Sequence, residues 1–150
     1  MALLALALAL VVAPAPTACD VHSPVPGPVV NGFEPVGLYA GHWGVDLLAE
    51  SGTPVTAALD GVVSFAGSIA GRRSVTVAHA GGLRTSYSYL ATIDATVGDR
   101  VAAGDALGTT GAEHGGTLHF SVRVFDRYVD PAELLSCRYL ADPSGGLWLA

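Results

Sequence analysis

The chain has 150 residues, 51% hydrophobic and 13% charged, which suits one domain with one buried core and excludes a disordered tail. Seven arginines, no lysine and thirteen acidic residues give a net charge of −6 without any basic cluster, so a nucleic-acid partner is not expected. The absence of lysine also excludes Schiff-base, lipoyl-lysine and biotinyl-lysine chemistry.

Residues 1–18 have the pattern of a secretory signal. An unbroken run of Ala, Leu and Val over residues 2–13 is too short to span a bilayer and is followed by Pro14, Pro16 and small residues. We therefore expect a secreted or cell-wall-associated protein with no transmembrane segment in the mature chain. Because no Lys or Arg precedes the run, a wrongly assigned start or an anchored helix is the alternative.

The two cysteines, Cys19 and Cys137, lie near the two ends of the mature chain. In an exported protein two cysteines most often form one disulfide, which would tie these ends together. Cys19 also follows the expected cleavage site directly, as a lipoprotein cysteine would, but Pro16 stands where such signals usually carry Leu. Two free thiols are the alternative if residues 1–18 are not a signal.

The remaining sequence predicts an all-β domain over residues 19–140, with a flexible tail over residues 141–150. Four prolines between residues 24 and 35 favour an extended edge segment and exclude a helix. Beyond residue 45, short runs rich in Val, Thr, Leu and Tyr alternate with glycines and show no helical period. The predicted strands are 45–48, 54–58, 61–66, 74–78, 84–90, 107–109, 117–125 and 128–129, and residues 131–135 are expected to form one helical turn.

A weak internal repeat indicates a duplicated unit. GTPVTA at residues 52–57 resembles GDRVAA at residues 98–103, and each leads into a predicted strand. Two related β-hairpin units are implied. We expect them to build a compact antiparallel β-sandwich whose halves face each other.

One candidate metal ligand pair begins the central part of the chain. Asp46 lies within the apolar run Val45–Leu48, where an unpaired carboxylate is costly to bury and needs a cation or strong donors. His42 precedes it by four residues, and Gly41 and Gly44 favour a tight turn over a helix there. A loop histidine and a turn aspartate are the alternative interpretation of this pair.

A third candidate ligand comes from the alternating segment 117–124. Thr117, His119, Ser121 and Arg123 share one face of the predicted strand, and four apolar residues share the other. The apolar face predicts core, which leaves His119 on a rigid polar face. Two imidazoles and one carboxylate with an open fourth position form a known catalytic zinc arrangement, so Zn²⁺ is the expected cofactor.

Five motifs follow one another within residues 26–135: GHWGVDL, GTPVTAALDGVVSFAG, VTVAHAGGLRTSYSYL, VGDRVAAGDALGTTG and LHFSVRV. In these motifs and their order the sequence resembles the lysostaphin-type (LytM-like) zinc metallopeptidases that cut peptide bonds in bacterial peptidoglycan. The resemblance implies an antiparallel β-fold with a substrate groove, zinc ligands at His42, Asp46 and His119, and peptidoglycan peptides as partners.

The sequence departs from that family at two positions. The resemblance leads us to expect a catalytic histidine two residues before the last ligand and another at the end of TSYSYL, but these positions are Thr117 and Tyr89. A neutral hydroxyl is no base near pH 7. His114, on a glycine-rich loop, is a candidate substitute for a missing histidine, and the alternative is that it is a solvated loop residue. Tyr89 could donate a hydrogen bond to a developing oxyanion, or it could form only part of the groove wall.

Three functions remain open at this point. The favoured one is a degenerate, zinc-holding domain that binds wall peptides or regulates a cell-wall hydrolase, with at most weak endopeptidase activity. The second is a working zinc endopeptidase that uses His114 or Tyr89. The third is a structural β-module with an empty site.

Overall fold

A computed structural model describes residues 21–136, 139–141 and 147–149, and it is built almost entirely of strands. The predicted signal at residues 1–18, Cys19 and Cys137 lie outside the described residues, so the signal and the disulfide remain predictions. No helix among the described residues is long and apolar enough to span a membrane. The elements are β1 Val29–Asn31, β2 Glu34–Val36, β3 Ala40–His42, β4 Val45–Leu48, β5 Pro54–Thr56, β6 Gly61–Ile69, β7 Arg72–Ala78, η1 Ala80–Gly82, β8 Leu83–Ser88, β9 Leu90–Ile93, β10 Arg100–Val101, β11 Ala106–Thr110, β12 Thr117–Val124, β13 Arg127–Val129, α1 Pro131–Leu135, β14 Tyr139–Ala141 and β15 Leu147–Leu149.

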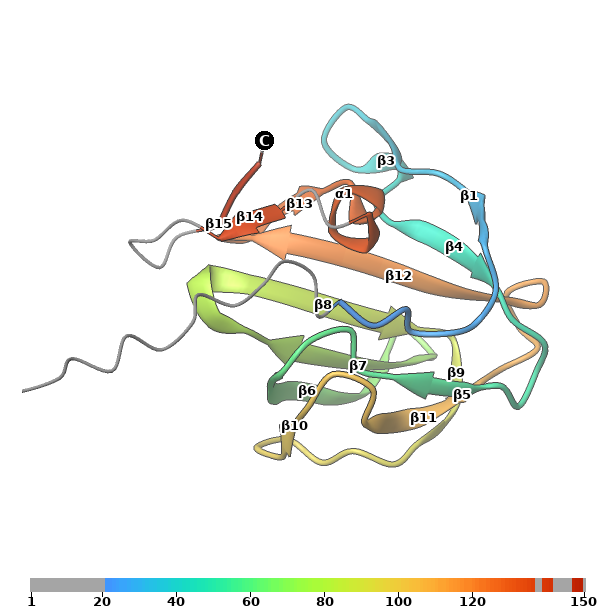
Figure 1. Cartoon of the computed structure of the whole chain (residues 1–150). Helices are drawn as coiled ribbons and strands as arrows, with labels where there is room; N and C mark the ends of the chain where they lie inside the picture. The colour runs from blue at the N-terminus through green and yellow to red at the C-terminus, as the bar shows by residue number, and fades with distance from the viewer. Residues whose placement is uncertain (1–20, 137–138, 142–146, 150) are drawn as a thin grey trace, which may run out of the picture.

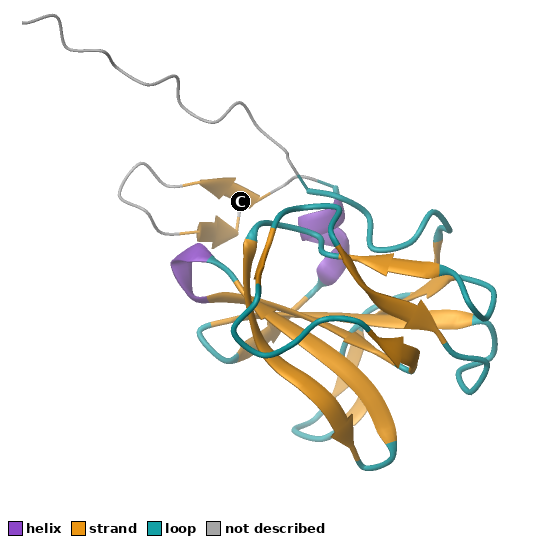
Figure 2. Ribbon diagram, turned by 90° about the horizontal axis from the view of Figure 1, so that it is seen from below, coloured by secondary structure: helices purple, strands orange, loops and turns teal. Residues whose placement is uncertain are grey.

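Two antiparallel sheets make up the body of the domain. The larger runs in the order β1-β4-β12-β8-β7-β6-β10, with β13 paired to β12, and the smaller runs β5-β11-β9. In Figure 1, β5 and β11 lie on the β6–β7 side of the molecule, away from β1 and β4. Figure 2 shows from below that the helical segments are confined to short turns. The expected all-β antiparallel fold is confirmed.

The core lies where the alternating faces of both sheets meet. Apolar residues of β12 and β7 contribute Phe120, Leu118 and Val77, and the smaller sheet contributes Val55 and Leu107, all of which are fully buried in one cluster. The apolar face expected for residues 117–124 is therefore the core face. Its opposite face is left free to carry polar side chains.

The two repeated segments exchange partners. β5 of the first repeat pairs with β11, which follows the second repeat, and β10 of the second repeat pairs with β6, which follows the first. Gly52 and Gly98 open the two segments with φ of +87° and +96°, a conformation that glycine adopts without strain. This reciprocal pairing locks the two halves of the chain together.

The eight predicted strands and the helical turn are present, with one break. The expected strand 84–90 is divided into β8 and β9, because Tyr89 has a φ of +68°. The extended edge segment contains β1, which does form an edge of the larger sheet. The β2–β3 hairpin, β10 and the β14–β15 pair, part of which falls in the expected tail, were not predicted.

A buried chain of hydrogen bonds crosses the core side of β8. His79 Nδ1–H donates to the carbonyl of Asp60 at 2.8 Å, and its Nε2 accepts from the Thr85 hydroxyl at 2.8 Å. Tyr87 Oη lies 2.9 Å from Thr85 Oγ1 and accepts from the Ala58 N–H at 2.8 Å. A protonated His79 would carry an N–H on both ring nitrogens, and its Nε2 could then not accept from the Thr85 hydroxyl. The chain of hydrogen bonds therefore requires a neutral His79. Burial lowers the pKa of His79 below its usual value of 6.5, which agrees with this assignment.

Replacing Tyr87 by Phe should lower the free energy of unfolding by about 1–3 kcal/mol, because the buried Ala58 N–H and Thr85 hydroxyl then lose their partner. Urea denaturation measures this change. Tyr39→Phe is the matched control, since Tyr39 is 93% exposed. Equal stability of the two variants would contradict the hydrogen-bond chain.

His79 should make stability depend on pH. Above its usual pKa the imidazole is neutral in both the folded and the unfolded chain, so the whole contribution is present. As pH falls below 6.5, the unfolded chain takes up a proton that the folded chain resists, so the free energy of unfolding decreases. Denaturation between about pH 7.5 and about pH 5 should show a flatter dependence for His79→Gln than for the unsubstituted chain. An identical dependence would exclude His79 as a cause.

Candidate metal centre

Three elements bring His42, Asp46 and His119 together. His42 ends β3, Asp46 is the second residue of β4, and His119 lies on β12 directly opposite Asp46 in the sheet register. One ligand atom from each side chain lies within 4.8 Å of the others. The three residues predicted as metal ligands therefore form one cluster.

Gly44 allows the turn between His42 and Asp46 to approach β12. A Cβ atom at this position would lie 2.6 Å from the Phe120 carbonyl oxygen and 2.7 Å from two atoms of the His119 ring. No larger residue fits without moving the backbone or the imidazole. The sequence GHWGVD thus needs its second glycine for close packing against a ligand.

The donor atoms have the spacing of a metal-binding cluster. Asp46 Oδ1 lies 3.1 Å from His42 Nε2 and 3.0 Å from His119 Nδ1, and these two nitrogens lie 3.1 Å apart. Zinc ligands at their usual bond lengths in a tetrahedron are about 3.3 Å apart. The cluster is thus compact enough for all three atoms to contact one small cation.

The protonation pattern also fits a cation. His42 Nδ1–H donates to the carbonyl of Gly32 at 2.6 Å, so the Nε2 of the neutral ring presents a lone pair to Asp46 and His119. Burial lowers the pKa of His119, although its contact with Asp46 partly opposes this, so this ring favours the neutral form that binds metals. Lone pairs that face one another across 3 Å repel unless a cation lies between them. The residues therefore fit a zinc ion.

Asp46 carries the negative charge of the cluster although it is only 4% exposed. Burial raises the pKa of this carboxyl, but its close contacts with Asn31, His119 and His114 more than offset this effect, and the pKa falls to about 2. Asn31 Nδ2 donates to Oδ2 at 2.9 Å from the neighbouring strand β1. No sequence pattern pointed to Asn31, because its register against Asp46 includes a β-bulge.

His114 joins the cluster from the glycine-rich loop. Its Nε2 lies 3.1 Å from Asp46 Oδ1, and its ring stacks on Tyr89 with centroids 3.8 Å apart and planes 6° apart. Gly115 and Gly116, with φ of +64° and +75°, turn the loop back into β12. Among the described residues, Asp46 is the only member of the three-residue cluster whose ligand atom is within hydrogen-bond distance of His114. These contacts place His114 against Asp46 and Tyr89, and its role as a substitute for the missing histidine stays a prediction.

Thr117 takes part in the site through the loop. Its hydroxyl donates to the carbonyl of His114 at 2.7 Å, and the residue is buried. The side chain therefore holds the loop that carries His114, and it cannot accept a proton from a substrate. This places one of the two substituted family positions in direct contact with the candidate substitute.

Strict alternation along the expected strand 84–90 would place Tyr89 on the same face as Thr85 and Tyr87, but the structure places it on the other face. Those two side chains are fully buried in the core, whereas Tyr89 lines the groove beside the metal cluster. Its positive φ inverts the alternation at this residue. The Arg72 guanidinium lies 5.5 Å from the centre of the Tyr89 ring, so Tyr89 contacts both a cation and an imidazole.

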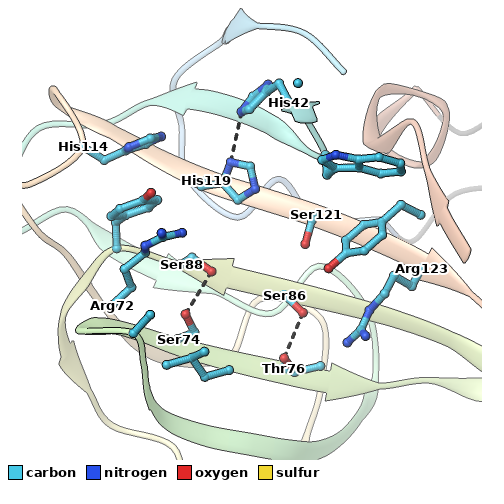
Figure 3. A pocket seen from close by; sticks show the side chains of 16 residues that line it. His42, Arg72, Ser74, Thr76, Ser86, Ser88, His114, His119, Ser121 and Arg123 are labelled. Carbon is cyan, nitrogen blue, oxygen red and sulfur yellow. Dashed lines mark hydrogen bonds between the residues drawn. The ribbon is translucent and has the colours of Figure 1, made fainter. Parts of the chain in front are cut away.

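A groove runs over the polar face of the large sheet from His114 to Arg123 (Figure 3), and Tyr89 and Tyr128 also line it. Its volume is about 510 Å³. Trp43 and Tyr128 form part of one wall, in edge contact with centroids 5.6 Å apart. Two rows of residues that are neighbours in register form its floor: Ser74, Ser88 and His119, then Thr76, Ser86 and Ser121. A groove was expected from the resemblance, but among the hydroxyl-bearing floor residues only those on 117–124 were predicted to share its polar face.

Comparison with known proteins identifies relatives of this site. The family model of peptidase family M23 matches residues 40–131. An uncharacterized protein of Mycobacterium tuberculosis is 42% identical over 63% of this chain and 41% of its own length. The DD-carboxypeptidase/endopeptidase Mpg of Neisseria meningitidis is 35% identical over 62% of this chain and 22% of its own length. A zinc-containing peptidase of Vibrio cholerae has a similar structure, with a TM-score of 0.63, 25% identity and coverage of 75% of this chain and 39% of that one. The chain thus spans less than half the length of each.

Zinc should stabilise the folded chain through the three-residue cluster. At free zinc about 100 times its dissociation constant, the free energy of unfolding should rise by about 2.7 kcal/mol. Thermal unfolding with and without zinc measures this change, and a chelator should reverse it. Asp46→Ala should abolish the zinc-induced shift, whereas Asp94→Ala, an exposed carboxylate outside the groove, should keep it. A shift that survives in Asp46→Ala would place the ion elsewhere.

Proposed function

Because the chain belongs to peptidase family M23, we propose that it is a zinc-dependent endopeptidase domain for peptidoglycan peptides, in which His114 supplies the missing catalytic imidazole. The observation that carries this proposal is the 3.1 Å contact between His114 Nε2 and Asp46 Oδ1. The resemblance of the motifs to lysostaphin-type enzymes and the activity in the name of the relative Mpg support the substrate class. Such a substrate requires a place outside the cytoplasm, in keeping with a signal at residues 1–18.

His42, Asp46 and His119 would hold the zinc ion. When bound, zinc polarises a peptide carbonyl and activates a water as nucleophile. Two of the ligands are held in the form that binds a metal. The Gly32 carbonyl fixes the tautomer of His42, and burial favours the neutral form of His119. Asn31 holds the second oxygen of the Asp46 carboxylate.

His114 would act as the general base beside these ligands. Its ring is half-buried, lines the groove and contacts Asp46, so it can take up a proton from a nucleophile and return one to the leaving amine. Tyr89 positions the ring by stacking, and Thr117 positions the loop by its hydrogen bond. Acid–base catalysis of this kind typically contributes about a hundredfold to ten-thousandfold in rate.

The same contact also supports a second candidate function. If His114 ligates zinc together with the other three side chains, the fourth position is closed and the ion cannot act on a peptide bond. The domain would then bind wall peptides in its groove, or regulate a cell-wall hydrolase, without cutting. The contacts favour the first candidate, because the ligand nitrogens of His42 and His119 approach each other to 3.1 Å, whereas His114 reaches Asp46 alone within the described chain.

His114→Ala separates the two candidates. As a base, its loss should lower chelator-sensitive cleavage of purified peptidoglycan by about a hundredfold to ten-thousandfold and leave zinc affinity within a few-fold of its original value. Mass spectrometry of new peptide ends and a competitive zinc titration measure these quantities. His22→Ala, which changes an exposed histidine outside the groove, is the matched control.

A large loss of zinc affinity in His114→Ala, with cleavage unchanged or increased, would support the closed site and overturn the role of His114 as base. Absence of cleavage by the unsubstituted zinc-loaded chain, with peptidoglycan still bound, would support the binding or regulatory function.

A further inference from the structure

Ser121 is a buried hydroxyl in the groove floor that has no hydrogen-bond partner among the described residues. It is only 7% exposed, and it lies between His119 and Arg123 on the groove face of β12 (Figure 3). The other four floor hydroxyls pair with each other, Ser74 with Ser88 at 2.9 Å and Thr76 with Ser86 at 2.8 Å. A buried polar group without a partner is rare and costly, so Ser121 points to a polar ligand group.

Arg123 follows on the same strand face and is free to bind an anion. Its guanidinium lies 5.6 Å from the centre of the Tyr128 ring, the residue opposite it in register, and no described carboxylate lies within ion-pair distance. Its other neighbour in register, Arg84, is by contrast bound to Asp126 at 2.6 Å. A stacked guanidinium keeps its planar donors aligned for a carboxylate.

The charge of the groove is opposite to the charge of the chain. The chain carries a net charge of −6, yet Arg72 and Arg123 line the groove, and no aspartate or glutamate of the described part of the chain does. Two arginines on a small groove suit a ligand with one or two negative charges and are too few to follow a polyanion.

We propose that the groove binds an extended peptide that carries a carboxylate about four residues from the bond held at the metal centre. Arg123 binds this carboxylate, and Ser121 binds the peptide backbone between the carboxylate and the metal centre. Four residues along β12 separate His119 from Arg123, or about 13 Å, and an extended peptide covers a similar length in the same number of residues. This assignment rests on the proposed function, and it adds the charge of the substrate peptide and the direction in which the peptide lies along the groove.

Binding of muropeptides tests the proposal. The probes are soluble muropeptides from muramidase-digested peptidoglycan and the same mixture with its carboxyl groups amidated. Proteins carry His114→Ala to stop turnover and are loaded with zinc, and calorimetry measures affinity. Amidation should weaken binding about tenfold, the effect of losing one charged hydrogen-bonded pair. Arg123→Gln should weaken binding of the unmodified muropeptides to the same extent, so that this variant no longer distinguishes them from the amidated ones. Ser121→Ala should weaken binding of both forms about threefold to tenfold.

Arg127→Gln is the control for charge, since Arg127 pairs with Val124 and lies on the face of β13 opposite Tyr128. Arg127→Gln should bind the unmodified and the amidated muropeptides with the same affinities as the protein that carries His114→Ala alone. If Arg123→Gln still discriminates between the two forms as strongly, the proposal for Arg123 is wrong while peptidoglycan recognition stands. If neither form binds with Arg123 intact, the proposed function itself is wrong and this inference falls with it.

Discussion

The carboxylate of Asp46, buried within an otherwise apolar strand, is the constraint around which the site is organised. A buried charge of this kind is stable only with close donors or a cation. Asn31 reaches it from the edge strand β1, His119 from β12, His42 from the β2–β3 hairpin and His114 from the glycine-rich loop. Segments far apart in the sequence are thus held at one point by a single negative charge. The low pKa of Asp46 reflects the same set of contacts.

The large sheet serves two purposes because its faces alternate. One face of β12 is entirely apolar and packs into the core with the smaller sheet. The other carries His119, Ser121 and Arg123 in sequence along the groove. A rigid strand therefore sets the spacing between the candidate metal centre and the site proposed for a carboxylate. The reciprocal pairing of the two repeats supports this strand from behind by fixing both halves of the chain.

Much of this arrangement could be predicted from the sequence. The period of residues 117–124 correctly assigned core and polar faces. The cost of burying Asp46 predicted a cation or strong donors beside it, and the structure places His42 within 3.1 Å of its carboxylate. Local patterns could not show which loop closes over Asp46, since the position of His114 depends on two left-handed glycines and a hydrogen bond from Thr117. The same limit applies to Tyr89, whose left-handed backbone inverts an otherwise regular alternation. Such departures arise from tertiary contacts rather than from local propensity.

The central claim is that zinc is held by His42, Asp46 and His119 while the imidazole of His114 stays outside the ligand set. Zinc K-edge X-ray absorption on the loaded chain tests it most directly, because the fine structure counts coordinated imidazoles. We expect two coordinated imidazoles in the unsubstituted chain and the same number in His114→Ala. Three imidazoles that fall to two in this variant would contradict it and would mean that His114 closes the site.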